Sequence, residues 1–121
     1  MSKSILIVDD SESIRELVGL TLESSGYKVV KGVDGVDGLN MLDGREINLV
    51  ITDLNMPNMD GIQLIREIRK KDGYSTIPIL MLTTESQATK KEEAKAAGAT
   101  GWIVKPFVQE KLLEVVKKVI R

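Results

Sequence analysis

The sequence contains no cysteine and no histidine among its 121 residues. Disulfide bonds, zinc sites built from cysteine and histidine, thiol nucleophiles and imidazole bases are therefore excluded. Any chemistry that the chain performs must use oxygen ligands, such as carboxylates, together with the ammonium group of lysine.

Neither sign of charge dominates, because 17 basic residues nearly balance 18 acidic ones. This balance gives no sign of a nucleic-acid backbone or an anionic membrane as a partner. The apolar runs are also short, and the first one, ILIV, falls far below the length of a signal-peptide core or a membrane span. We therefore expect a cytoplasmic protein that binds neither nucleic acid nor membrane, folded as one domain over residues 1–121.

Short apolar runs predict the buried strands of a parallel sheet, and they are SILIVD, LVITD and IPILMLT. YKVVK and GWIVK are weaker strand candidates. Between them, apolar residues recur at helical spacing, for example from Ile14 to Leu22 and from Leu112 to Ile120. Strand and helix therefore alternate five times, which predicts an α/β fold with a doubly wound parallel sheet of (βα)5 type.

Residues that start and end helices are placed regularly along the chain. Asp34 and Asp60 stand where N-caps are expected, and the local repeat GVDGVDG includes the first of them. Glycines follow the expected helices, where a left-handed residue ends a helix without steric cost, and they are Gly26, Gly44, Gly73 and Gly98.

Polar and charged residues stand where the expected strands end. Asp9 and Asp10 follow the first strand, Asp53 the third, Thr83 the fourth and Lys105 the fifth. In sheets of this kind, ligands bind outside the carboxyl ends of the strands, near the point where the strand order reverses. The sequence therefore predicts a site in which three acids, a hydroxyl and an ammonium meet.

Each of these residues also has a simpler explanation when it is taken alone. The two adjacent acids, Asp9 and Asp10, could cap a helix, Thr83 is typical of a strand end, and Lys105 could be a solvated surface charge. Taken together, three crowded carboxylates repel one another and favour a hard cation with oxygen ligands, for which Mg²⁺ is the best candidate. Such a site suits the transfer of a phosphoryl group to an aspartate, with Asp53 as the nucleophile.

The segments ILIVDD, VITDLNMPNMDG, PILMLTTES and AGATGWIVKPF resemble the receiver domains of two-component response regulators, over residues 5–120. The resemblance implies a flavodoxin-like sheet with strand order 2-1-3-4-5. It also implies that Asp53 accepts phosphate from a histidine kinase. Mg²⁺ would be held by Asp9, Asp10, Asp53 and the backbone carbonyl of Asn55.

The resemblance assigns further roles around the phosphorylated residue. The Lys105–Pro106 bond is typically cis in this family, and Lys105 would point at the phosphate. Thr83 would move to hydrogen-bond the phosphoryl group, and Trp102, at a position more often held by tyrosine or phenylalanine, would act as the switch aromatic. Asn55 and Glu85 would tune the lifetime of the phosphate.

Within this family, the chain most resembles stand-alone chemotaxis regulators. We therefore expect a non-enzymatic signalling protein that catalyses only its own phosphorylation and dephosphorylation, with a flagellar motor switch protein as its target and a phosphatase as a possible partner. The expected fourth helix, near Lys90 and Lys91, is poor in large apolar residues. This helix could offer a surface for a partner, or it could be a marginal surface helix.

Other functions remain as alternatives. The chain could be a phosphorelay intermediate, or it could regulate a target other than the motor. A phosphatase of the haloacid-dehalogenase type also uses an aspartate nucleophile, but there it is the first acid of a D-x-D pair, where this chain has adjacent acids. A flavodoxin-like cofactor site is disfavoured by the acidic loop DDSES and by the 3% aromatic content. An EF-hand starting at Asp53 would need glycine in place of Asn58.

Overall fold

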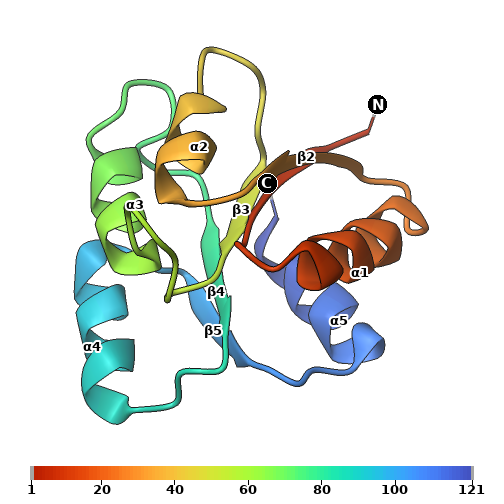
Figure 1. The fold of residues 1–121 in the computed structure, drawn as a ribbon. Helices are drawn as coiled ribbons and strands as arrows, with labels where there is room; N and C mark the ends of the chain where they lie inside the picture. Colours follow the sequence, from red (N-terminus) through yellow and green to blue (C-terminus); the bar gives the residue numbers. More distant parts are fainter. Residues whose placement is uncertain (1, 121) are drawn as a thin grey trace.

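The computed structural model of the protein describes residues 2–120. Within this range, a parallel sheet forms the centre of the molecule (Figure 1). Its strands are β1 (Ser4–Val8), β2 (Lys28–Gly32), β3 (Leu49–Thr52), β4 (Ile79–Thr83) and β5 (Gly101–Val104). They pair in parallel in the order β2-β1-β3-β4-β5, which confirms the predicted doubly wound sheet and its strand order.

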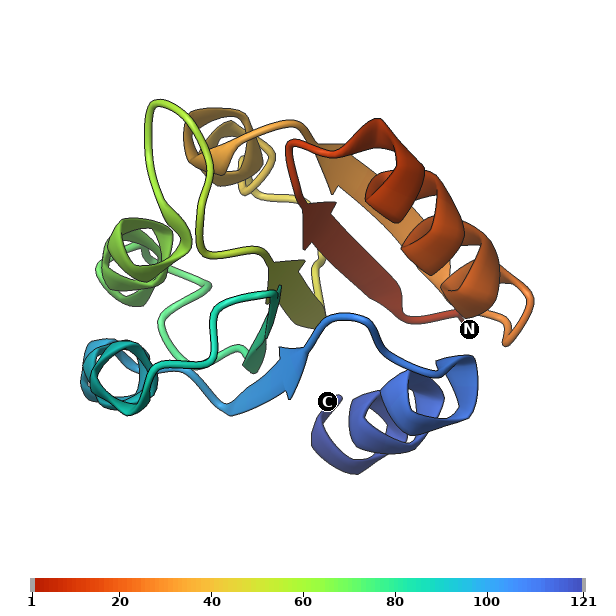
Figure 2. The same cartoon turned by 60° about the horizontal axis from the view of Figure 1, so that its bottom comes forward.

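Helices cover both faces of the sheet, as the alternation of strand and helix predicted. They are α1 (Glu12–Glu23), α2 (Gly35–Asn40), α3 (Gly61–Arg69), α4 (Ala88–Ala97) and α5 (Gln109–Val119). Figure 2 shows α1 and α5 together on one face, and α2, α3 and α4 on the other. No helix within residues 2–120 is long and apolar enough to cross a membrane.

The central strands are buried on both faces, which explains their continuous apolar sequences. In β1, Leu6 and Val8 belong to the core beside α2, α3 and α4, whereas Ile5 and Ile7 belong to the core beside α1 and α5. The two weaker strand candidates form the edge strands β2 and β5. Edge strands bury less of their surface, so their apolar pattern is less complete.

The predicted helix boundaries are present. The side chains of Asp34 and Asp60 cap α2 and α3 by accepting backbone N–H bonds, each of 2.8 Å. The predicted terminal glycines Gly26, Gly44, Gly73 and Gly98 have φ values of 93°, 107°, 87° and 116°. In α4, Ala94 is the buried residue, as its weak apolar stripe indicated.

Candidate functional site

Backbone hydrogen bonds extend the sheet just beyond the ends of its strands and set the spacing of the site. The N–H of Asp53 donates to the carbonyl of Val8 at 2.9 Å, which places Asp53 beside Asp9. The N–H of Lys105 donates to the carbonyl of Thr83 at 2.8 Å. Because β1 and β3 are neighbours where the strand order reverses, Asp9 and Asp53 stand at the switch point of the sheet.

The Lys105 side chain crosses the sheet edge and joins two carboxylates. Its Nζ lies 2.8 Å from Oδ2 of Asp9 and 3.1 Å from Oδ2 of Asp53. The side chain of Lys105 is 11% exposed, and that of Asp9 is 3% exposed. Lys105 is therefore no solvated surface charge, although its single positive charge cannot balance all the acids around it.

Asp10 completes the acidic cluster from a more exposed position. One carboxylate oxygen from each of Asp9, Asp10 and Asp53 lies within 4.8 Å of the other two. Oxygen ligands at this spacing, with solvent access at one side, suit Mg²⁺, which keeps several waters when it binds to proteins. These residues therefore fit the cation that the sequence predicted.

The surroundings of Asp9 show why the capping explanation for the two adjacent acids does not hold. Ser11 caps α1, because its Oγ accepts the N–H of Ile14 at 3.3 Å. Oδ1 of Asp9 instead accepts the N–H of Ser11 at 2.9 Å, and the Arg15 guanidinium donates to the carbonyl of Asp9 at 2.6 Å. Sequence reasoning missed the contacts of Ser11 and Arg15, since they depend on the path of the loop.

The electrostatics of the cluster show a shortage of positive charge. Burial raises the pKa of Asp9 above its ordinary 3.8, and hydrogen bonds from Lys105 and Ser11 offset this only in part. Burial alone would lower the pKa of Lys105, but Asp9 and Asp53 outweigh it and raise this pKa above 10.5. The 2.8 Å contact between the Asp9 carboxylate and this ammonium of raised pKa supports an ionised pair. A divalent cation would relieve the remaining excess of negative charge.

The loop after Asp53 closes tightly on itself. The N–H of Gly61 donates to the carbonyl of Leu54 at 2.8 Å, and a Cβ at Gly61 would collide with the carbonyl oxygen of Asp53. Glycine is therefore required where α3 begins. Asn55 lies on this loop with an exposed side chain. Asp60 acts as an N-cap, as described above.

A second set of contacts leads from the strand ends to the surface of α4. Thr83 is fully buried, and its Oγ1 accepts the N–H of Glu85 at 3.2 Å. The indole Nε1 of Trp102 donates to the carbonyl of the same Glu85, also at 3.2 Å. Glu85 therefore links Thr83 and Trp102, a connection that the sequence alone did not reveal.

The Lys105–Pro106 peptide bond is cis, as the resemblance implied.

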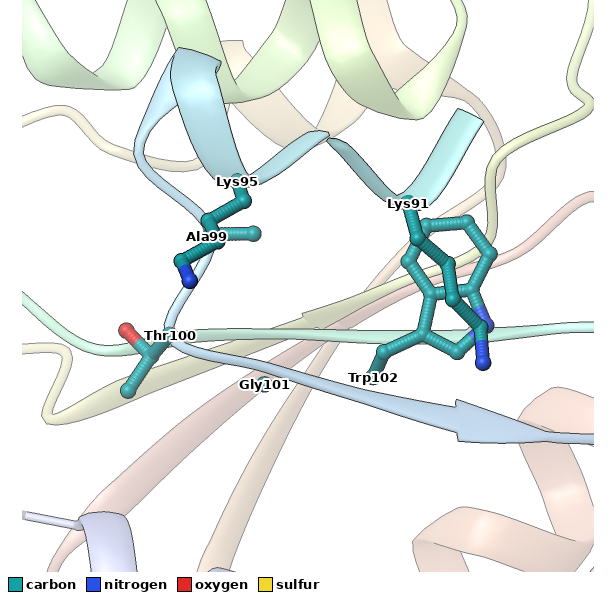
Figure 3. A pocket seen from close by; sticks show the side chains of 6 residues that line it. All are labelled: Lys91, Lys95, Ala99, Thr100, Gly101 and Trp102. Atoms are coloured by element: carbon teal, nitrogen blue, oxygen red, sulfur yellow. The ribbon is translucent and has the colours of Figure 1, made fainter. Parts of the chain in front are cut away.

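Trp102 is half-buried on β5, where α4 packs beside the strand. Figure 3 shows the Lys91 side chain lying against the indole ring, and its Nζ is 5.9 Å from the ring centre. This distance is within the range of a cation–π contact. Lys91, Lys95, Ala99 and Thr100 line the same surface hollow as Trp102.

The fold and the acidic strand-end site define a receiver domain. The chain belongs to the response regulator receiver domain family, whose sequence model matches residues 5–117. It is 36% identical to the chemotaxis protein CheY of Pseudomonas aeruginosa over 116 residues, which are 95% of this chain and 94% of that protein. It is also 35% identical to RpaA of Synechocystis, a DNA-binding dual master transcriptional regulator, covering 97% of this chain but 48% of RpaA.

Solved structures show the same relationship. Chemotaxis protein CheY4 of Vibrio cholerae superposes with a TM-score of 0.94 at 44% identity, covering 98% of this chain and 99% of that one. A CheY-like receiver domain from Methanospirillum hungatei superposes with a TM-score of 0.91 at 30% identity, covering 98% and 93%. Receiver domains are signalling modules of two-component systems that bind Mg²⁺ in an acidic pocket and work with a histidine kinase and a target protein.

Proposed function

We propose that Asp53 accepts a phosphoryl group from a histidine kinase, and that the phosphorylated protein signals by changing its affinity for another protein. The observation that carries this proposal is the Lys105 ammonium, which lies within 3.1 Å of the Asp53 carboxylate and 2.8 Å of the Asp9 carboxylate. A nucleophilic carboxylate, a fixed ammonium and further carboxylates for a cation are the groups that phosphoryl transfer to aspartate needs.

In the proposed reaction, a carboxylate oxygen of Asp53 attacks phosphorus. The new O–P bond forms as the bond between phosphorus and the imidazole nitrogen of the donor breaks, and the electron pair of that bond leaves with the imidazole. The Lys105 ammonium offsets the charge on the transferred oxygens from its position beside Asp53. Asp9, Asp10, Asp53 and the backbone carbonyl of Asn55 would hold Mg²⁺, which supplies further positive charge at the phosphoryl oxygens when it is bound.

The proposed switch runs from Thr83 to Trp102. The Thr83 hydroxyl, buried at the end of β4, would donate to a phosphoryl oxygen on Asp53. This movement would disturb the hydrogen bond that the Glu85 N–H donates to Thr83. The carbonyl of the same Glu85 accepts the hydrogen bond of the Trp102 indole. Phosphorylation would then favour an inward position of the indole ring. The change is a shift between two populated states, because phosphate acts only through its different interaction with each.

Asn55 and Glu85 are proposed to set the lifetime of the phosphate. Asn55 is exposed on the loop after Asp53, and Glu85 is partly buried after β4. Oε2 of Glu85 accepts the N–H of Gln87 at 3.3 Å, which holds this carboxylate near the start of α4. Polar side chains at these two positions would admit water to the phosphoryl group and give a short-lived signal.

Chemotaxis is the output that we propose, with a flagellar motor switch protein as the target and a phosphatase that ends the signal. Support comes from relatives named as chemotaxis proteins, which match this chain over 94% and 99% of their own length. The alternative, a phosphorelay intermediate or a regulator of a target other than the motor, is suggested by the similarity to RpaA. The two outputs differ in the protein that the phosphorylated form binds.

Phosphorylation is tested with acetyl phosphate and Mg²⁺, followed by intact-mass measurement. We expect the wild type to gain one phosphoryl group, and Asp53→Asn to gain none. Asp43→Asn is a matched control, because Asp43 is an exposed acid paired with Arg45 in the loop before β3, at the opposite end of the sheet. Uptake by Asp53→Asn at the wild-type rate would contradict the assigned nucleophile.

The output is tested in a motile bacterium that lacks its own chemotaxis regulator. Expression of the wild type should restore spreading in soft agar, and Asp53→Asn should not. A parallel pull-down with beryllium fluoride, a stable phosphoryl mimic, would recover the motor switch protein. If the mimic instead enriches a histidine-containing phosphotransfer protein or another regulator, the alternative output is correct.

A further inference from the structure

The loop between Asp53 and Gly61 contains a backbone turn that needs support from outside. Asn58 has φ of 70°, and it is the non-glycine residue with positive φ within residues 2–120. The N–H of Met59 donates to the carbonyl of Pro57 at 2.8 Å, a bond across a single residue. This combination is typical of a classic γ-turn, which is rare and strained. Such turns persist where neighbouring groups hold them in place.

The support comes from the start of α2. Nδ2 of Asn58 donates to Oδ2 of Asp34 at 2.7 Å, while Oδ1 of Asp34 caps α2 by accepting the N–H of Asp37. Gly35, the next residue, packs so closely that a Cβ there would collide with the carbonyl oxygen of Met59 and lie 2.7 Å from its Cβ. A hydrogen bond and a close backbone contact therefore hold both sides of the γ-turn.

The same helix also packs against the strand that carries the acidic cluster. A Cβ at Gly38 would lie 2.6 Å from Cγ2 of Val8, the residue before Asp9. The glycines of the GVDGVDG repeat thus allow α2 to approach both β1 and the loop after β3. Hydrogen bonds from the Asp37 N–H and the Asn58 amide lower the pKa of Asp34, which keeps this carboxylate ionised as an acceptor.

We propose that Asp34 is a positioning residue for the phosphoacceptor site, which it serves by holding Asn58 and thereby the loop from Asn55 to Met59. Asp34 lies outside the cluster formed by Asp9, Asp10 and Asp53. It acts by fixing the loop whose Asn55 carbonyl is the proposed cation ligand, so the inference rests on the proposed function. Asp34 thus affects Mg²⁺ affinity and phosphoryl transfer without contacting the ion or the phosphoryl group.

Two substitutions separate this role from helix capping. In Asp34→Ser the hydroxyl still caps α2, but it is too short to reach the amide of Asn58. In Asn58→Gly the residue still adopts φ of 70°, but the amide is lost. Asp37→Ser is the matched control, because Oδ2 of Asp37 accepts the N–H of Val33 just before the same helix, whereas the Asn58 amide donates to Asp34.

The readouts are amide exchange at Met59 in the protein without metal, Mg²⁺ affinity by calorimetry, and the initial rate of phosphorylation by acetyl phosphate. Asp34→Ser should speed Met59 exchange and weaken Mg²⁺ affinity about tenfold, the usual scale for residues that orient metal ligands. The double variant Asp34→Ser with Asn58→Gly should bind Mg²⁺ no more weakly than whichever single variant has the lower affinity. Asp37→Ser should change Mg²⁺ affinity less than about twofold, whatever its effect on melting temperature.

Wild-type Mg²⁺ affinity and wild-type Met59 exchange in Asp34→Ser would overturn the inference. An equal loss of affinity in Asp37→Ser would also overturn it, because the effect would then belong to α2 in general. Failure of the proposed function is distinguishable, since the wild type itself would then take up no phosphate. Met59 exchange and Mg²⁺ affinity would still decide the role of Asp34 in that case.

Discussion

Helices α3 and α4 lie side by side on one face of the sheet, yet they are held very differently (Figure 1). α3 is capped by Asp60 and buries Ile62, Leu64, Ile65 and Ile68. α4 has no side-chain hydrogen bond at its N-cap, Gln87, and Ala94 is its buried residue. α3 follows the loop that carries Asp53, whereas α4 follows the segment that links Thr83 to Trp102.

This difference separates two requirements of a receiver. The proposed phosphoacceptor site needs side chains held in fixed positions, because phosphoryl transfer depends on positioning and charge. A response surface needs an element with few buried apolar contacts, since such elements change conformation at low cost in free energy. The two neighbouring helices thus place a rigid region beside a loosely held one, and the predictions below test this contrast.

The largest expected effect is on stability. Ile65→Ala in α3 should lower the free energy of unfolding by about 2–5 kcal/mol, because it leaves a cavity in the core. Lys91→Ala in α4 should change it by less than about 0.5 kcal/mol, since this side chain is exposed. Urea denaturation measures both values. Equal losses in the two helices would remove the contrast between them.

Lys105→Ala tests the rigid site chemically. Loss of the ammonium beside Asp53 should slow phosphorylation by acetyl phosphate about a hundredfold at saturating Mg²⁺, the scale seen when a fixed electrostatic partner is removed. The fold should be preserved, which far-ultraviolet circular dichroism checks. A rate close to that of the wild type would show that Lys105 does not assist the transfer.

Asp9→Asn tests the charge balance of the same site through pH. A carboxyl whose pKa is raised on folding contributes stability below pH 3.8, and this stability is lost as the pH rises through its folded value. At about pH 7 the metal-free variant should therefore be more stable than the wild type, by about 1 kcal/mol. It should also lose most of the stabilisation that Mg²⁺ gives the wild type by binding the folded state.

Denaturation curves measured from below pH 3.8 to about pH 7, with and without Mg²⁺, follow both effects. A variant that is less stable than the wild type across this range would show that the ionised Asp9 stabilises the fold. The bond with Lys105 would then outweigh burial.

The smallest effect is expected at Trp102, on the loosely held side. Phosphorylation should reduce iodide quenching of Trp102, because an inward indole loses contact with water. Thr83→Ala should still take up phosphate but show a smaller change in quenching, since the path through Glu85 is cut. Asp53→Asn is the control. Unchanged quenching in a wild type shown by mass to be phosphorylated would leave Trp102 as a packing residue.

Features that depend on a local pattern could be predicted from the amino-acid sequence alone. Continuous apolar runs predicted the buried strands, and the acids and lysine directly after them predicted which side chains would meet at the sheet edge. The caps Asp34 and Asp60 and the left-handed glycines such as Gly98 followed from backbone chemistry within a few residues. The strand order came from the resemblance to a family.

Contacts between distant parts of the chain depend on the tertiary structure. Lys105 meets Asp9 across 96 positions and Asp53 across 52, and Asn58 meets Asp34 across 24. Sequence spacing does not give the distance between the atoms of such pairs, because the crossovers of the sheet and the path of each loop set it. Asp34 shows most clearly what local sequence leaves out. Its local pattern predicted a helix cap, but only the fold brings Asn58 close enough to donate to its second carboxylate oxygen.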